Sequence, residues 1–358
     1  MKQISVSTPG KIHLLGEHAV VYGKPALLTA IDSHCTVHLT PTQKTEIILI
    51  DKKLQKKITI SPEMIITKTK NAQKIWRKYS LENNVSILKS LTENEMDYPI
   101  IAIGETLLYY KQNLVTGFTL TIDSSLPIGA GLGSSAALAV SVVAAVATFL
   151  DANVNLNTIN DIAFLVEQKR HGLPSGADNS IVCFGGLVWF RKESVDLKIV
   201  QSVPFTLSQK LAQNFLLIDT GKPLESTGEM VQHVQTLYQK KSEVVERFLQ
   251  DQELATRGLL TAIKNGQEEL LMQLITKGEK NLEEIGVVSS LAKSLIRKIE
   301  KLGGAAKICG AGGIKKGAGV LLAYHQQKDI LETVAKEDNL PYYSVTLGAK
   351  GIKIKVIK

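Results

Sequence analysis

A glycine-rich segment, PIGAGLGSSAAL at residues 127–138, has the clearest chemical meaning in the chain. It follows a predicted strand and precedes an apolar stretch at residues 136–150, which we expect to be helical. Glycines let backbone N–H groups converge on an anion, and a helix N-terminus already favours negative charge. The segment therefore predicts a phosphate site formed by Pro127, Gly129, Ala130, Gly131, Leu132, Gly133, Ser134 and Ser135.

The same segment has a simpler alternative, a glycine-rich turn in which Ser134 or Ser135 caps the following helix. It is not a Walker loop, because no lysine and hydroxyl pair ends it, and the GLGSS run lacks the dinucleotide-binding spacing. Three more segments carry candidate chemistry: PGKIHLLGEHAVVYGKPAL at 9–27, EQKRHGLPSGADN at 167–179 and KICGAGG at 307–313.

The segments at residues 9–27, 127–138 and 307–313 resemble, in this order, the three motifs of the GHMP kinases, a superfamily of small-molecule kinases. Within that superfamily, GEHAVVYGKPAL at residues 16–27 is similar to the mevalonate kinase family. Residues 167–179 resemble the part of that family that carries a metal-binding glutamate and the catalytic aspartate. The resemblance implies an enzyme that transfers the γ-phosphoryl group of ATP to mevalonate with the help of Mg²⁺.

The resemblance also implies the catalytic residues. Asp178 matches the aspartate that orients or deprotonates the attacking hydroxyl, and Lys11 matches the lysine beside it. A carboxylate beside a cation stays ionised at neutral pH, and phosphoryl transfer needs little beyond alignment and charge neutralisation. Ser135 and Glu167 match the Mg²⁺ ligands, which suits hard oxygen donors. Each assignment has an alternative without function. Lys11 and Asp178 could form a structural ion pair, Glu167 could be a solvated helix residue, and Ser135 could be a helix cap.

The acceptor site implied by the resemblance consists of Glu17, His18, Ser226, Thr227, Gly310, Ala311 and Gly312. Glu17 would need a cation or hydroxyl partner beside an anionic acceptor, and the sequence does not indicate which. Ser226 and Thr227 could reach the acceptor or cap a helix, because Ser226 and Glu229 have capping-box spacing.

The third motif departs from the family pattern, because Ile314, Lys315 and Lys316 interrupt the usual glycine run. The two lysines could contact phosphate or face solvent. Four further histidines show no metal-ligand spacing, and we interpret them as surface or core residues: His13, His34, His38 and His233. Two other functions stay open. One is a kinase for another acceptor, such as a phosphomevalonate kinase, and the other is a non-catalytic sensor with the same fold.

Both strands and helices must position these residues. The strands are expected at residues 4–16, 27–40, 117–127, 185–190, 342–347 and 352–357, with a hairpin at 48–60. The helices are expected at residues 71–79, 158–169, 253–266, 268–285, 290–302 and 329–337, with another starting after Ser226. This pattern predicts an α+β fold of two domains, residues 1–195 and 196–358. The resemblance implies a strand-rich nucleotide-binding N-terminal domain and a ferredoxin-like α+β C-terminal domain.

Composition limits the partners and the compartment. The formal charge is +8 for 358 residues, which favours anionic ligands, but the basic residues are scattered and aromatic residues are only 5%, so we do not expect nucleic-acid binding. Three widely spaced cysteines and the absence of a signal-like N-terminus predict a cytoplasmic protein. Residues 126–150 are uncharged, but their glycines and proline indicate a buried helix rather than a membrane span. A homodimer is expected from the resemblance alone.

Overall fold

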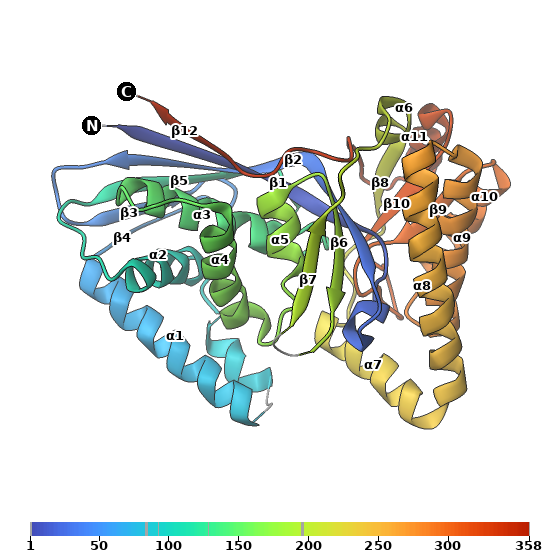
Figure 1. Cartoon of the computed structure of the whole chain (residues 1–358), viewed down its shortest axis with the longest axis horizontal. Coiled ribbons are helices and arrows are strands. Elements are labelled where there is room, and N and C mark those ends of the chain that lie inside the picture. Colours follow the sequence, from blue (N-terminus) through green and yellow to red (C-terminus); the bar gives the residue numbers. More distant parts are fainter. Residues whose placement is uncertain (1, 83–84, 92, 128, 195–196, 358) are drawn as a thin grey trace.

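The residues that the structure describes form two β-sheets, each covered by helices. The computed structural model describes residues 2–82, 85–91, 93–127, 129–194 and 197–357. One sheet has eight strands and the other has four, and the helices lie beside them in two groups, one in each half of the molecule (Figure 1). The predicted α+β fold is therefore confirmed.

The eight-stranded sheet carries the N-terminal part of the candidate site. Its strand order is β12-β1-β2-β5-β3-β4, with β6 paired to β2 and β7 paired to β6. Neighbouring strands are antiparallel, except that β3 and β5 are parallel. The hairpin predicted at residues 48–60 is present as β3 and β4. The strands are β1 Gln3–Leu15, β2 Ala26–Pro41, β3 Ile47–Asp51, β4 Lys56–Ile60, β5 Phe118–Ser124, β6 Leu187–Lys192, β7 Lys198–Ser202 and β12 Lys353–Ile357.

Helices α2, α4 and α5 of this half pack around α3, whose residues 139–147 are all buried. It contacts β1 and β2 on one side and α2, α4 and α5 on the others, which explains its continuous apolar sequence. In the described part of the chain, no helix is long and apolar enough to cross a membrane. The helices are α1 Pro62–Glu82, α2 Asp97–Tyr110, α3 Ser134–Phe149, α4 Leu156–His171 and α5 Ala177–Phe184, with 3-10 turns η1 Ala19–Tyr22 and η2 Val85–Leu91.

The helix predicted at residues 71–79 is part of the longer α1. This helix begins at Pro62, a residue that suits the first helical position, and the Ser61 hydroxyl accepts a hydrogen bond from the Met64 N–H at 3.3 Å. The first two turns were missed because their large apolar residues, Met64, Ile65 and Ile66, stand together without helical spacing and the start signal is a single Ser-Pro pair. Only four residues of α1 are buried along its 21 residues.

The second half contains the four-stranded sheet, in the order β11-β8-β10-β9. Helices α9 and α10 pack against β9 at one edge of this sheet, as the right-hand side of Figure 1 shows. The strands are β8 Phe215–Asp219, β9 Ala305–Ile308, β10 Val320–Tyr324 and β11 Tyr342–Ser344. The helices are α6 Gln209–Gln213, α7 Thr227–Lys240, α8 Ser242–Asn265, α9 Glu268–Glu284, α10 Ser290–Lys301 and α11 Lys328–Glu337. The helices expected at residues 268–285, 290–302 and 329–337 are confirmed, and the one expected at 253–266 is the end of α8, which stops at Asn265 with Gly266 as its C-cap.

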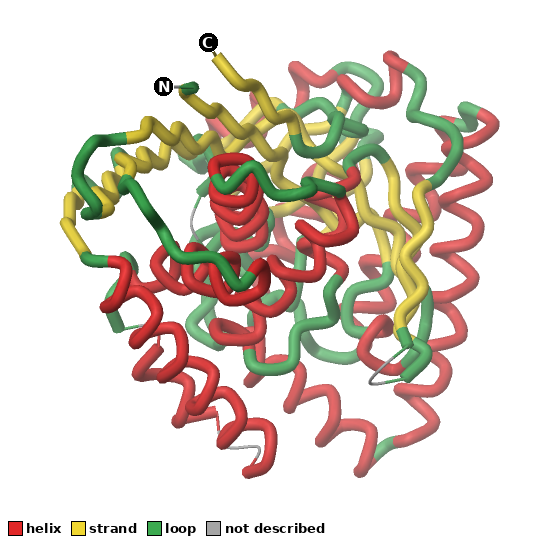
Figure 2. Tube along the Cα trace, turned by 60° about the vertical axis from the view of Figure 1, so that its left-hand side comes forward, coloured by secondary structure: helices red, strands yellow, loops and turns green. Residues whose placement is uncertain are grey.

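Strand pairing crosses the domain boundary that the sequence predicts at residue 195. Both β7 and β12 lie beyond that residue, yet they pair with strands of the eight-stranded sheet. Gln3 in β1 pairs with Ile357 in β12, so the two ends of the chain lie side by side (Figure 2). One buried cluster extends from Ile4 to Leu347 and includes residues of both halves. The division into 1–195 and 196–358 stays a prediction.

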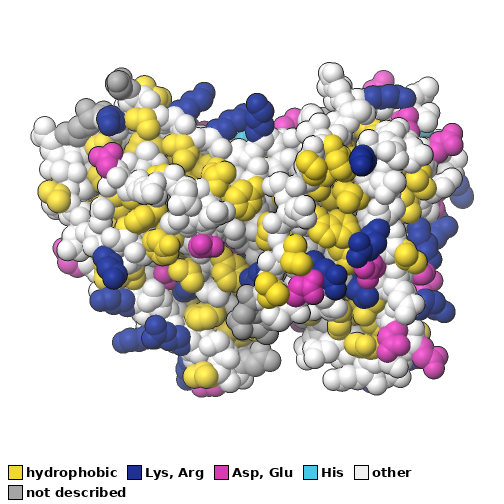
Figure 3. Space-filling model, viewed as in Figure 1, with side chains coloured by type: hydrophobic (Ala, Val, Ile, Leu, Met, Phe, Trp, Pro, Cys, Tyr) yellow, Lys and Arg dark blue, Asp and Glu magenta, His cyan; other side chains and the backbone are white. Residues whose placement is uncertain are grey.

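The two halves are separated at one edge by a notch. It lies between the part that carries α1 and the part that carries α7, and it is visible at the lower edge of the space-filling view (Figure 3). Strand β1 runs through the middle of the molecule and is therefore placed to hold residues between the two halves (Figure 1).

Candidate active site

Lys11 and Asp178, the predicted catalytic pair, lie in contact. Lys11 is on β1 and Asp178 is in the first turn of α5, which packs against β1. Lys11 Nζ is 3.0 Å from Asp178 Oδ1, and the side chains are 5% and 38% exposed respectively. The register of β1 against β2 shifts between Pro9 and Gly10, just before Lys11, and such irregularities change the direction in which side chains point.

The environment of Asp178 keeps its carboxylate ionised. Burial alone would raise the pKa of Asp178, but Lys11 and His13 together hold it well below its usual range. His13 contributes because its Nε2 atom lies 3.6 Å from Asp178 Oδ1. The group is therefore a carboxylate at any pH at which the protein would work, able to accept a hydrogen bond from a hydroxyl.

The glycine-rich loop lies directly against Lys11. The Lys11 N–H donates to the Leu132 carbonyl at 3.0 Å, and a Cβ atom at Gly133 would lie 2.6 Å from Lys11 Cγ. Gly129, Gly131 and Gly133 all have positive φ angles, of 78°, 77° and 73°, so the loop needs glycine at these positions.

The helix that follows this loop has an open N-terminus. Gly133 is the N-cap of α3, and no side chain caps the helix. The alternative that Ser134 or Ser135 serves as the N-cap is therefore wrong. The first N–H groups of an uncapped helix are available to an anion. The arrangement suits a phosphate group beside Lys11.

Ser135 and Glu167, the predicted Mg²⁺ ligands, come together from α3 and α4. Ser135 Oγ lies 3.4 Å from Glu167 Oε2 and 3.2 Å from His171 Nε2. Glu167 is 2% exposed, so the alternative of a solvated helix residue is wrong. The Tyr98 hydroxyl donates to the other carboxylate oxygen, Oε1. Burial and this neighbouring carboxylate raise the pKa of Tyr98 well above its usual value, so the phenol keeps its proton.

This donor set fits a magnesium ion that is shared with a nucleotide. A carboxylate and a hydroxyl oxygen are hard ligands, and Mg²⁺ usually takes one or two protein oxygens together with phosphate oxygens and water. Within the described residues, no group of three or more His, Cys, Asp and Glu side chains is placed to hold a metal. The two oxygens could therefore hold the ion together with a nucleotide, whose phosphates would complete its coordination.

Glu17 and His18 are buried, and each is tied to the third motif. Lys307 in β9 donates to the Glu17 carboxylate, and also to the backbone carbonyls of Ile308 at 2.6 Å and His13 at 3.3 Å. His18 Nε2 lies 3.0 Å from the Ala311 carbonyl oxygen. Burial lowers the pKa of His18 from its ordinary value, although the bond to Ala311 opposes this shift. The cation that Glu17 requires is thus Lys307, 290 residues further along the chain.

The third motif lies beside the glycine-rich loop. A Cβ atom at Gly131 would be 3.3 Å from the Cys309 carbonyl oxygen, and Gly310 and Gly312 both have positive φ angles. The structure therefore brings the motif that contains Gly310, Ala311 and Gly312 next to the predicted phosphate site.

The segment before α7 lies near the departure from the family pattern. Ser226 is the N-cap of α7, and with Glu229 it forms the complete capping box that the spacing predicts. Glu225 Oε2 accepts a hydrogen bond from the Ile314 N–H at 3.2 Å, while Lys315 and Lys316 are exposed. A substrate contact by Ser226 or Thr227 stays a prediction.

Sequence reasoning missed four residues at this site. His13, interpreted above as a surface or core residue, contacts Asp178, and a signal was available because residues 11 and 13 of one strand share a face. Lys307 lies in the quoted third motif, but nothing local indicates its partner. Tyr98 and His171 contact the predicted metal ligands, Tyr98 from outside the quoted segments and His171 from within the one at residues 167–179.

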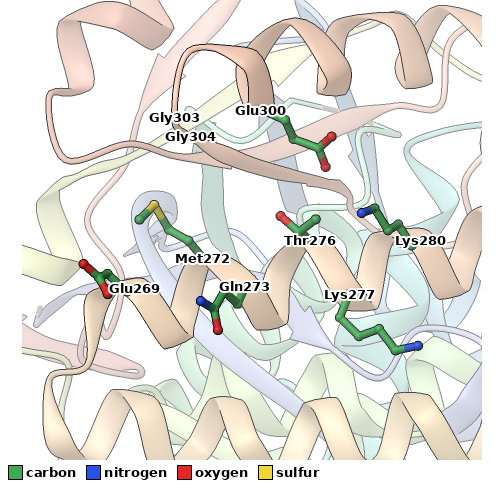
Figure 4. Close-up of a pocket in the computed structure, with 9 residues that line it drawn as sticks. All are labelled: Glu269, Met272, Gln273, Thr276, Lys277, Lys280, Glu300, Gly303 and Gly304. Atoms are coloured by element: carbon green, nitrogen blue, oxygen red, sulfur yellow. The ribbon is translucent and has the colours of Figure 1, made fainter.

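A separate groove lies between α9 and the loop after α10. It has a volume of about 560 Å³ and is lined mainly by polar and charged side chains of α9, together with Glu300, Gly303 and Gly304 (Figure 4). None of the predicted site residues lines it, so the groove is not part of the candidate active site.

The sequence and the fold are similar to those of known kinases. The family described as GHMP kinases N terminal domain matches residues 99–186. The mevalonate kinase of Schizosaccharomyces pombe is 30% identical over 388 residues, covering 99% of this chain and 92% of that protein. The crystal structure of the Methanococcus jannaschii mevalonate kinase is similar with a TM-score of 0.77 at 24% identity, covering 96% of this chain and 98% of that chain. The L. major mevalonate kinase in complex with R-mevalonate has a TM-score of 0.72 at 21% identity, with 96% of each chain covered.

Proposed function

Because the chain belongs to the mevalonate kinase family, we propose that its site transfers the γ-phosphoryl group of ATP to the 5-hydroxyl of mevalonate. The products are 5-phosphomevalonate and ADP. The observation that carries this proposal is the contact between Lys11 and Asp178 beside the open N-terminus of α3. It occurs in a chain that aligns with a mevalonate kinase over 99% of its length.

Asp178 orients the acceptor hydroxyl and takes its proton late in the reaction. The low pKa of this carboxylate makes it a weak base toward a free alcohol. In the loose transition state of phosphoryl transfer, the bond to the attacking oxygen forms late. The hydroxyl becomes acidic only as that bond forms, and the proton then moves to Asp178. The main contribution of the carboxylate is therefore alignment of the nucleophile.

Lys11 links the acceptor to the phosphate. Its Nζ contacts Asp178, while its Cγ lies against Gly133 of the loop. A cation at this position neutralises charge that develops on the transferring group, and it keeps Asp178 ionised between turnovers. The phosphates themselves are held by the backbone N–H groups of the glycine-rich loop and of the first turn of α3, with Ser134 beside them.

Ser135 and Glu167 would hold Mg²⁺ in this proposal. When bound, the ion would neutralise negative charge on the phosphates. Tyr98 occupies Glu167 Oε1, which leaves Oε2 directed toward Ser135. The phenol thereby fixes which carboxylate oxygen faces the nucleotide.

The acceptor is placed between the first and third motifs. His18 contacts the Ala311 carbonyl, and Lys307 joins Glu17 to β9, so the segments that carry the predicted acceptor residues are already held together. Gly310, Gly312, Ser226 and Thr227 complete the proposed acceptor site. We also propose a cytoplasmic location, because all three cysteines are buried and free. The homodimer rests on the family resemblance and can be tested by analytical ultracentrifugation.

The test is ADP release by the purified protein with ATP, Mg²⁺ and each of mevalonate, 5-phosphomevalonate, galactose and homoserine. Turnover on mevalonate that is lost in Asp178→Ala supports the proposal. We expect Asp178→Ala to lower kcat by about 10³-fold or more with nearly unchanged ATP affinity, because Asp178 acts on the nucleophile and not on the nucleotide. Turnover on another acceptor would keep the chemistry and change the substrate. Tight ATP binding with no turnover on any acceptor would favour the sensor.

A further inference from the structure

We propose that His13 is a positioning residue for Asp178, holding the carboxylate through an Nε2–H group so that the acceptor hydroxyl meets it in one orientation. The proposal rests on the function proposed above, since it assigns Asp178 to the acceptor. It concerns a residue for which the family resemblance gave no role, and which the sequence indicated only as a surface or core histidine.

The position of His13 on β1 supports this role. Lys11 and His13 pair in regular register with Ala30 and Leu28 of β2, so their side chains lie on the same face of the strand. The closest approach of each to Asp178 is to the same atom, Oδ1, at 3.0 Å for Lys11 Nζ and 3.6 Å for His13 Nε2. Because Lys11 and His13 both approach Oδ1, the other oxygen of Asp178, Oδ2, is left for the acceptor hydroxyl.

The distance of 3.6 Å is longer than a hydrogen bond. Contacts between catalytic groups are often long before the substrate binds and shorten in the complex. A small rotation of the Asp178 side chain, which is partly exposed, suffices to bring Oδ1 within hydrogen-bond range. The ring itself is held more firmly, because its side chain is only 11% exposed and the His13 carbonyl accepts a hydrogen bond from Lys307.

The other ring nitrogen indicates which atom carries the proton. His13 Nδ1 is buried and has no hydrogen-bond partner within the described residues. A proton on Nδ1 would bury an unpaired donor and would leave an acceptor facing a carboxylate, which is repulsive. A proton on Nε2 instead directs a donor at Asp178 and leaves only an unpaired acceptor. Of the two tautomers, the Nε2–H form is therefore the one that fits the site.

This arrangement is difficult to explain as a stabilising core contact. An imidazole with one buried nitrogen unpaired costs stability relative to an apolar side chain of similar size. A leucine at position 13 should therefore leave the melting temperature unchanged or raise it. A loss of activity in such a variant would arise from the lost donor and not from damage to the fold.

The test compares three variants at position 13 with a matched control. A glutamine amide can place its N–H group near the position of His13 Nε2, whereas the shorter asparagine reaches only the position of Nδ1. We expect His13→Leu and His13→Asn to lower kcat by about 100-fold with little change in the KM for ATP, because a small misplacement of a catalytic group costs about this much. His13→Gln should retain most of the activity. The control is His38→Leu on β2, an exposed histidine, which should match the wild type.

Two results would overturn the proposal. The first is an unchanged kcat in His13→Leu, and the second is an equal loss in His13→Gln and His13→Asn, which would indicate a packing role. If His13→Leu does not fold, the comparison of His13→Gln with His13→Asn still tests the proposal.

A spectroscopic measurement separates this inference from the proposed function. The ¹⁵N shifts of His13 should show the proton on Nε2 and should change in Asp178→Asn, whatever the acceptor is. Shifts that report a proton on Nδ1, or that do not respond to Asp178→Asn, would refute the inference even if the protein phosphorylates mevalonate.

Discussion

Replacing Lys307 with methionine should destabilise the protein strongly, because it leaves a buried carboxylate without its cation. The Lys307 side chain is 0% exposed and donates to Glu17, to the His13 carbonyl and to the Ile308 carbonyl. Glu17 Oε2 already has no hydrogen-bond partner among the described residues. Removal of one partner of a buried ion pair typically costs about 3–5 kcal/mol in the free energy of unfolding.

This free energy can be converted into a shift of the melting temperature. An unfolding entropy of about 2.1 cal/mol/K per residue amounts to about 0.75 kcal/mol/K for 358 residues, so the melting temperature should fall by about 4–7 °C. Differential scanning calorimetry measures this shift directly. The matched control is Lys277→Met, which removes a lysine from an exposed ion pair with Asp251. That variant should show a much smaller shift, because exposed pairs contribute little.

A double variant tests whether the unpaired Glu17 carboxylate causes the destabilisation. Lys307→Met with Glu17→Gln removes both charges of this pair, so the melting temperature should recover much of its fall. The reasoning is refuted if Lys307→Met melts like Lys277→Met, or if the double variant melts no higher than Lys307→Met. The first result would mean that Glu17 is solvated in solution, and the second that the lysine stabilises mainly through the two carbonyls.

Three further predictions follow from the described residues. Burial raises the pKa of Glu279 to about 8, against 4.5 for an unperturbed glutamate, so the folded state binds an extra proton between these values and loses stability as pH rises through them. Because of this group, the free energy of unfolding should fall by about 2–3 kcal/mol between pH 6 and pH 9, as measured by urea unfolding at both pH values. The fall should be absent in Glu279→Gln. Gly133→Ala should lower kcat by about 100-fold in steady-state assays, because the left-handed backbone disfavours alanine and the new methyl group would displace Lys11. Ser135→Ala and Glu167→Gln should each raise the Mg²⁺ concentration for half-maximal activity by about tenfold or more, and an unchanged titration would exclude that residue as a ligand.

The local elements were predictable from the sequence, but their long-range pairing was not. The hairpin at residues 48–60 and the helices at 268–285 and 290–302 follow from alternation, amphipathic spacing and cap residues, all of which are local. The pairing of β12 with β1 joins strands about 350 residues apart, and the short, largely exposed β12 carries no signal that names its partner. The same is true of β7, which the predicted boundary at residue 195 separates from the sheet that it extends.

In the candidate site too, residues within local motifs were predictable from the sequence, whereas contacts between distant segments were not. Lys11, Asp178, Ser135 and Glu167 were named because they lie in segments that resemble a family, and the structure brings each pair into contact. The partner of Glu17 could not be named, because it lies 290 residues away on another sheet. Whether Ser135 caps α3 could not be decided either, since it depends on the backbone angles of Gly133 and not on residue type.

Strand β1 connects two lysine–carboxylate pairs that differ in exposure, and this difference separates their roles. The Asp178 side chain is 38% exposed and can meet a substrate, whereas the side chains of Lys307 and Glu17 are 0% and 2% exposed and meet each other. A buried ion pair costs much of its Coulombic gain in desolvation, so stability alone does not explain why one is placed here. Lys307 also binds the carbonyl of His13, the residue whose ring faces Asp178. The enclosed pair therefore fixes the backbone of β1 relative to the third motif, and with it the position of the groups that hold the exposed carboxylate.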